Sequence, residues 1–351
     1  MRWRALLTSL LIVGTSGVAC AAPPRLAVHG RVLVDPAGHP IQLRGWNWGH
    51  WGSAQPQDAA DNVAQGANAV RIPLRWWGAW GGHDVDSRDD AAVATAGIEP
   101  THLRTLDAMV AQASRAGLWI VLFVDSNCGQ NGTQDADERR YCDPQGAYPQ
   151  GHNFWSDPDA RRRFAAVWRF LAQRYRDVPR LGLFEPLPEP NPPGVAPAAI
   201  TDFYDEVMRA VRPLAPGVPF LVGGRRYRAE NVDAAWNARW HDVVYTANLY
   251  LHPHAHGMDG LRRHLDALTR LRDARDVPVF VQQAGVRSGD DPDRVGLDAS
   301  LDALAAAQVG YAYWEYRGAS NRDSYGVLYR ANGGWTTKDA WLRDIGAHFR
   351  Q

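Results

Sequence analysis

Short apolar runs alternate with amphipathic segments through most of the chain. Residues 119–124 are continuously apolar, which is typical of a strand buried on both faces of a parallel sheet. Residues 102–116 instead place Leu103, Leu106 and Val110 at helical spacing. The pattern predicts eight strands, at residues 41–47, 67–73, 119–124, 181–187, 220–223, 243–250, 279–284 and 310–314. It predicts helices at residues 58–65, 102–116, 157–176, 198–214, 230–238, 261–275, 293–307 and 337–350.

Each predicted strand is followed by a helical stretch, which is the order of a (β/α)8 TIM barrel. Consecutive parallel strands need crossover helices, and this many strands favour closure into a ring. An open doubly wound sheet is the alternative, but no glycine-rich phosphate turn follows the first strand. Residues 26–43, with a turn at residues 35–38, predict an N-terminal β-hairpin over the barrel floor. We expect a single domain over residues 23–351.

The first residues have the pattern of a secretory signal peptide. Arg2 and Arg4 precede a short apolar run at residues 6–13, and small residues surround Cys20. The run is shorter than the roughly 20 residues that span a bilayer. We therefore expect residues 1–22 to be removed and the protein to be secreted or periplasmic, with no membrane anchor. A lipoprotein anchored through Cys20 is the alternative.

Charge and cysteine content narrow the classes of partner and cofactor. Lysine plus arginine equals aspartate plus glutamate, at 38 each, so no electrostatic footprint for nucleic acid is present. In an oxidising compartment Cys128 and Cys142 are expected to form a disulfide. Two thiols at this spacing form no zinc pattern, and we expect neither a metal nor a cofactor.

Candidate chemistry stands at the carboxyl ends of the predicted strands, where barrel enzymes keep their active sites. The strand ends are LRGWNWG, NAVRIPLRWW, LFEPLPEPN, YTANLYLHP, PVFVQQAGV and YAYWEY, in that order along the chain. In order and spacing this series resembles the cellulase-like glycoside hydrolase family 5, of clan A. The resemblance covers essentially the whole chain from about residue 26.

The resemblance implies a role for individual residues. It places the family's strand-2 arginine at Arg71, its acid/base glutamate at Glu189, its strand-6 tyrosine at Tyr250 and its strand-8 tryptophan at Trp314. Four positions depart from the family pattern: Asp125 and Asn248 stand at histidine positions, Pro188 replaces asparagine, and Gln283 replaces the nucleophilic glutamate.

The substitution at Gln283 removes a group that retaining hydrolysis needs. One carboxyl must protonate the leaving oxygen while a second, about 5–5.5 Å away, attacks the anomeric carbon. A neutral amide is a poor nucleophile, and losing its charge should lower the pKa of Glu189 relative to a site that has it. Asp125 is an alternative carboxylate: at about 6.5–9.5 Å from Glu189 the pair could run an inverting mechanism through water. Glu315 and Glu185 are further candidates, and Glu185 is expected to pack or orient the site.

The tryptophans indicate a carbohydrate ligand, because sugar C–H faces stack on aromatic rings. Trp48, Trp51 and Trp76 are predicted to join Arg71, Asn248, Tyr250 and Trp314 in binding substrate. The first hypothesis is a glycoside hydrolase acting on a β-linked glucan or mannan. The second is a non-catalytic polysaccharide-binding pseudoenzyme, favoured by Gln283. We expect a monomer in either case.

Overall fold

The structure is a computed structural model that describes residues 23–49, 55, 57–75, 89–96, 100–125, 155, 158–191, 194–253, 257–318 and 323–351. Eight parallel strands form a closed barrel in the order β10-β11-β4-β5-β6-β7-β8-β9. Their bounds are β4 Arg44–Asn47, β5 Ala69–Arg75, β6 Trp119–Asp125, β7 Leu181–Glu185, β8 Phe220–Gly223, β9 Val243–Leu251, β10 Val279–Val286 and β11 Gly310–Tyr313. The (β/α)8 barrel predicted from the sequence is confirmed.

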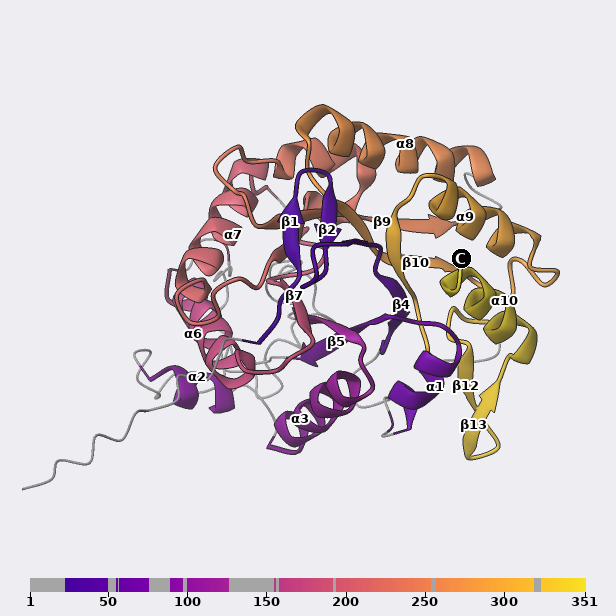
Figure 1. Cartoon of the computed structure of the whole chain (residues 1–351), viewed down its shortest axis with the longest axis horizontal. Coiled ribbons are helices and arrows are strands. Elements are labelled where there is room, and N and C mark those ends of the chain that lie inside the picture. The colour runs from indigo at the N-terminus through magenta and orange to yellow at the C-terminus, as the bar shows by residue number, and fades with distance from the viewer. Residues whose placement is uncertain are drawn as a thin grey trace, which may run out of the picture.

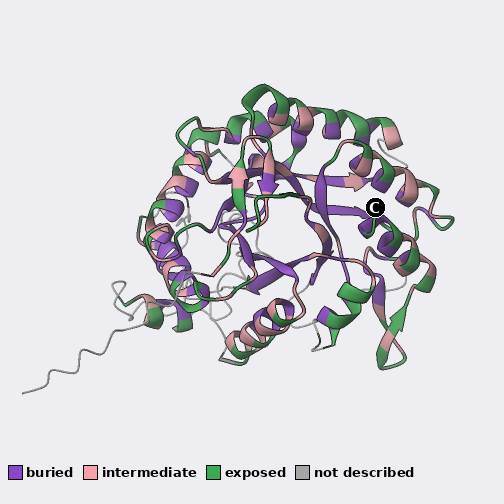
Figure 2. Cartoon of the chain, viewed as in Figure 1, coloured by how far each residue is buried: buried purple, intermediate pink, exposed green. Residues whose placement is uncertain are grey.

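Helices form a layer around the ring of strands (Figure 1). Their bounds are α1 Asp58–Ala64, α2 Asp90–Ala96, α3 Pro100–Arg115, α6 Pro158–Tyr175, α7 Pro197–Val211, α8 Gly257–Arg275, α9 Val295–Ala306 and α10 Asp339–Phe349. They present buried sides to the strands and exposed sides outward (Figure 2). The ring closes where Tyr311 pairs with Arg44, so that the last strand lies beside the first. This two-layer arrangement brings the strand ends to one mouth.

A small antiparallel sheet lies across the opposite end of the ring (Figure 1). It contains β1 Ala27–His29, β2 Val32–Val34 and β3 Pro40–Ile41, in that order. Leu26, Leu33 and Leu43 pack with apolar side chains that fill the barrel interior. The predicted hairpin therefore gains a third short strand, and its leucines keep water out of the barrel floor.

Two observed elements differ from the prediction. A two-stranded hairpin, β12 Leu328–Ala331 and β13 Gly334–Thr337, precedes the last helix and was not predicted. The predicted helix at residues 230–238 is a 3-10 helix, η2 Ala229–Ala235, and a further 3-10 turn, η1 Arg225–Tyr227, precedes it. The predicted signal peptide and both cysteines lie outside the described residues. Among the described helices, none is both long and apolar enough to cross a membrane.

Candidate active site

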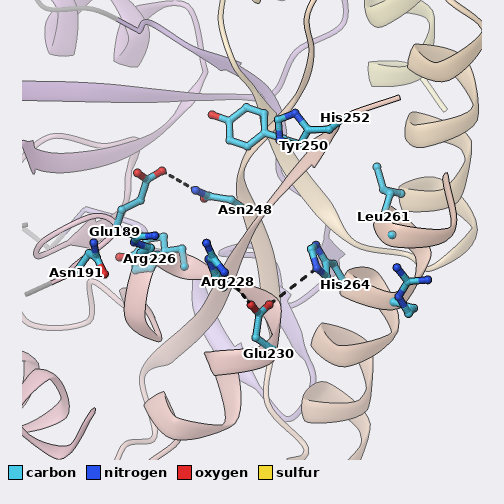
Figure 3. A pocket seen from close by; sticks show the side chains of 13 residues that line it. Glu189, Asn191, Arg226, Arg228, Glu230, Asn248, Tyr250, His252, Leu261 and His264 are labelled. Carbon is cyan, nitrogen blue, oxygen red and sulfur yellow. Dashed lines mark hydrogen bonds and ion pairs between the residues drawn. The ribbon is translucent and has the colours of Figure 1, made fainter. Parts of the chain in front are cut away.

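Glu189 lies at the mouth of the barrel, four residues beyond the end of β7. Its backbone has a φ of 49°, which is uncommon for a residue other than glycine. Asn248 of β9 donates its Nδ2 hydrogen to Glu189 Oε1 at 2.5 Å (Figure 3). The side chain is only partly exposed. The turn after β7 thus aims the predicted acid/base group across the mouth toward the neighbouring strand.

Burial raises the pKa of the Glu189 carboxyl above its ordinary value. The hydrogen bond from Asn248 and the positive charge of Arg71 oppose this shift, while the charges of Glu185 and Asp125 add to it. Gln283 supplies no negative charge that would raise the pKa of Glu189. The pKa is still above its ordinary value, because burial is the largest influence on it. A raised pKa keeps the proton that a general acid must donate.

Arg71 lies beneath this mouth and is fully buried. Its Nε and terminal nitrogen bond both carboxylate oxygens of Glu185, at 2.6 and 3.0 Å, and its other terminal nitrogen bonds Asn47 Oδ1 at 2.8 Å. The guanidinium carbon lies 3.5 Å from the ring centroid of Phe123. The sequence placed Arg71 among groups that touch substrate. Its burial corrects this: Arg71 holds Glu185, and it acts on Glu189 through its charge.

Gln283 occupies β10 beside Asn248 in the strand register. Tyr250 donates its hydroxyl hydrogen to Gln283 Oε1 at 2.6 Å. Burial and the charge of Glu189 raise the pKa of the Tyr250 hydroxyl well above its ordinary value, so it remains a donor. Position 283 therefore carries a neutral amide whose oxygen already accepts a hydrogen bond from a neighbour. No negative charge is present at this position.

A second amide contact explains how Asn248 faces Glu189. Gln282 donates its Nε2 hydrogen to Asn248 Oδ1, which leaves the Asn248 Nδ2 hydrogens for Glu189. The pairing of β10 with β9 shifts in register between Phe280 and Gln283. The side chains of two successive glutamines therefore both lie near Asn248. Two neutral amides, Gln282 and Asn248, thus form a chain of hydrogen bonds to Glu189, and Asn248 stands where the family pattern has a histidine.

Gly285 permits the aromatic wall beside Gln283. A Cβ atom there would lie 3.1 Å from Tyr325 and 3.2 Å from Tyr250, and 2.9 Å from the Trp314 carbonyl oxygen. The rings of Tyr250 and Tyr325 have centroids 5.1 Å apart. Tyr325 was not predicted, because it lies in the long segment after β11 and no strand-end pattern includes it.

Asp125 ends β6 and is partly exposed. Its charge raises the pKa of both Glu185 and Glu189, so the three carboxyl groups share one end of the barrel. Trp314 follows β11 and is also partly exposed, with its backbone nitrogen donating to the Ala284 carbonyl at 2.7 Å. Both residues are partly exposed at strand ends, and their predicted roles in the site stay predictions.

Trp48 differs from its prediction as a substrate-binding residue. It is 1% exposed, and its Nε1 donates to Asn62 Oδ1 at 2.8 Å. Because helix α1 covers the ring, Trp48 belongs to the packed core rather than to a sugar platform. Trp51, Trp76, Cys128 and Cys142 lie outside the described residues, so their predicted roles stay predictions.

A cavity of about 640 Å³ opens beside Glu189, between η1, β9 and α8 (Figure 3). Its walls include Glu189, Asn248 and Tyr250 together with Arg226, Arg228, Glu230, His252, Arg263 and His264. The basic members were not predicted. The signal available for them was the run of arginines after β8, at residues 225–228. Across the ranges that the structure describes, no group of three metal-binding side chains is present.

The model of the cellulase family, glycosyl hydrolase family 5, matches residues 34–320. The chain therefore belongs to glycosyl hydrolase family 5. A probable glucan 1,3-beta-glucosidase A from Aspergillus fumigatus is 30% identical over 209 residues, covering 57% of this chain and 44% of that protein. A beta-xylosidase from Phanerodontia chrysosporium is 24% identical over 197 residues, covering 55% and 37%. The chain thus spans less than half the length of these curated relatives.

Solved structures share the fold at low sequence identity. The endoglucanase Cel5A from Thermotoga maritima superposes with a TM-score of 0.64 at 17% identity, covering 88% of this chain and 96% of that one. An endogalactoceramidase gives a TM-score of 0.69 at 16% identity, covering 92% and 84%. These similarities establish the barrel; the chemistry of this chain depends on its own side chains.

Proposed function

We propose that this chain is a glycoside hydrolase that cleaves a β-linked polysaccharide, a glucan or mannan, with Glu189 as general acid. One observation carries the proposal: Glu189 faces an open cavity at the barrel mouth while burial raises its pKa. A carboxyl whose pKa is raised keeps its proton to higher pH and can donate it to the oxygen of a leaving sugar. The named curated relatives, a glucan glucosidase and a xylosidase, support β-linked glycans as the substrate class.

The mechanism that this site favours is a single displacement through water. Gln283 supplies no charge for a covalent glycosyl intermediate. Asp125 is the proposed base: it takes a proton from water, the water oxygen bonds to the anomeric carbon, and the bond to the leaving oxygen breaks. Glu189 donates its proton to that oxygen, and the product has inverted stereochemistry. Solvent then returns a proton to Glu189 and removes one from Asp125.

A second candidate function is polysaccharide binding without cleavage. The hydrogen bond from Tyr250 to Gln283 favours it, because the side chain at the nucleophile position is a neutral amide whose oxygen is already hydrogen-bonded. In that case the mouth would bind the same glycans with no product. The two functions differ in one measurable quantity, the appearance of new reducing ends.

Glu189→Gln is expected to lower hydrolysis by about 10²–10⁴-fold while glycan binding persists, because the amide keeps the shape and loses the transferable proton. Reducing-end assays on glucans, mannans and xylans, paired with affinity electrophoresis, measure both. Asp125→Asn should cause a loss of similar size. Asp233→Asn, which changes an exposed carboxylate on η2, is the matched control and should leave activity unchanged. Binding by the native protein without any product would instead establish the second function.

The pH dependence of hydrolysis should reflect the raised pKa of Glu189. Hydrolysis is expected to fall as pH rises through that pKa, above the usual range of a glutamate, because the donating form is lost.

The raised pKa of Glu189 also affects folding: the favourable contribution of protonated Glu189 is present at low pH and lost as pH rises through its raised pKa. The melting temperature of Glu189→Gln should therefore exceed the native value at about pH 8 and approach it at about pH 4. A melting-temperature difference that is constant with pH would contradict the raised pKa.

A further inference from the structure

The cavity beside Glu189 carries an excess of positive charge. Arg226, Arg228 and Arg263 line it, against two carboxyl groups, Glu189 and Glu230. Arg228 shares Glu230 with His264, at 3.5 and 3.9 Å. Arg226 and Arg263 make no ion pair with any described acidic side chain, and both are exposed. Arginine guanidinium groups that are not neutralised around a concave surface attract an anionic ligand.

Arg226 is fixed relative to the acid by the backbone. Its amide nitrogen donates to the Pro190 carbonyl at 2.8 Å, in the residue that follows Glu189. Glu189, Arg226 and Tyr227 are three of the seven described non-glycine residues with positive φ. Tyr227 is buried and donates its hydroxyl hydrogen to the Leu187 carbonyl at 2.9 Å. Unusual backbone conformations gathered at one place indicate a segment whose shape serves a site.

The walls of this cavity do not suit an uncharged sugar as well as an acidic one. A neutral pyranose ring is bound by stacking its C–H face on an exposed aromatic ring. Here Tyr227 is buried, and beyond Tyr250 the wall is mainly polar: it includes three arginines and two histidines, with Glu189, Glu230, Asn191 and Asn248. A guanidinium group presents a planar fork of hydrogen-bond donors that matches a carboxylate or a sulfate ester.

We propose that the cavity formed by Arg226, Arg228 and Arg263 is a subsite for a sugar residue that bears an anionic substituent, on the leaving-group side of the scissile bond. This rests on the proposed function, which makes Glu189 the group that protonates the leaving oxygen. The sugar released with that oxygen must then lie against Glu189, and the cavity is the space next to it. A hexuronate carries its carboxylate directly on that ring, within one sugar unit of the acid.

The test compares matched oligosaccharides on the full chain by isothermal titration calorimetry. Cellohexaose and laminarihexaose are each used in three forms: neutral, oxidised to the carboxylate at C6, and sulfated at O6. The native protein is expected to bind an acidic form at least about 10-fold more tightly than the neutral form, as one charged hydrogen bond implies. Raising the salt concentration should reduce this preference. The carboxylate and sulfate forms distinguish the two sources of negative charge.

Charge-removing variants locate the effect. Arg226→Gln and Arg263→Gln should each reduce the preference for the acidic form by about 10-fold or remove it. Arg262→Gln is the matched control: it changes the adjacent arginine of α8, which pairs with Asp259 at 3.4 Å and does not line the cavity. Equal binding of neutral and acidic forms overturns this inference while leaving the proposed function intact. Absence of binding to all forms overturns this inference together with a glucan as the substrate of the proposed function. A preference that survives in both variants also overturns it, because the charge then acts elsewhere.

Discussion

Gln283→Glu is expected to raise hydrolysis of a β-linked glycan by on the order of 10³-fold and to change the product from the inverted to the retained anomer. The substitution restores a charged oxygen at a position that pairs with Asn248 in the β9–β10 register. Asn248 is itself bonded to Glu189. Tyr250, which donates to Gln283 at 2.6 Å, would donate to the new carboxylate and stabilise its ionised form. The negative charge should also raise the pKa of Glu189 further.

Proton NMR of the anomer that appears first distinguishes retention from inversion, and a reducing-end assay gives the rate. The matched control is Gln282→Glu, which places the same carboxylate one residue earlier, at a fully buried side chain that bonds Asn248. This control should give no retaining activity, because its carboxylate lies under the mouth. A folded Gln283→Glu variant with the rate and stereochemistry of the native protein would show that position 283 does not face the anomeric carbon.

Arg71→Met is expected to lower the free energy of unfolding by about 3–5 kcal/mol, which makes it the most destabilising of the changes considered. Arg71 and Glu185 are both fully buried, and removing the guanidinium leaves the carboxylate without its counter-charge. Asn47 would lose a donor in the same step. Urea unfolding monitored by tryptophan fluorescence measures the change.

Two further variants test whether Arg71→Met loses stability because it leaves a buried charge unpaired or because it removes a contact. The double variant Arg71→Met with Glu185→Leu should recover most of the stability, because an apolar pair of similar volume replaces the ion pair. Arg212→Met breaks a pair with Asp242 of similar geometry, at 2.7 and 2.9 Å, but with both partners about one-third exposed. It should cost about 1 kcal/mol or less. Equal losses for Arg71→Met and Arg212→Met would contradict the role given to burial.

Strand-end positions were well predicted from the sequence because barrel geometry gives them a common location. A residue that ends a parallel strand must stand at the same mouth as the ends of its neighbours. Glu189, Asn248, Tyr250 and Gln283 are brought together for this reason, although they come from three different strand ends. The residue pattern does not reveal the direct bonds among them, the second amide from Gln282 or the register shift in β10.

Burial was the quantity that the sequence could not supply. Arg71 and Trp48 have the residue types of ligand-binding groups, yet both are enclosed, and their partners Glu185 and Asn62 lie 114 and 14 residues away. A side chain at a strand end faces either the ligand or the layer beneath it, and neighbouring elements determine which. The hairpin β12–β13 was missed for a related reason, since its short strands carry few apolar residues.

The sequence by itself determined the alternation of strands and helices and the closed barrel, because these depend on periodicity. It determined the family through the order and spacing of the strand-end motifs, and the neutral side chain at position 283 through the identity of one residue. Only the tertiary structure decided that Arg226 and Arg263, which are 37 positions apart, line one cavity with Glu189. Chain segments after β8 and within α8 meet there through packing against the barrel. The arginines after β8 are visible in the sequence, but nothing along the chain indicates that Arg263 joins them.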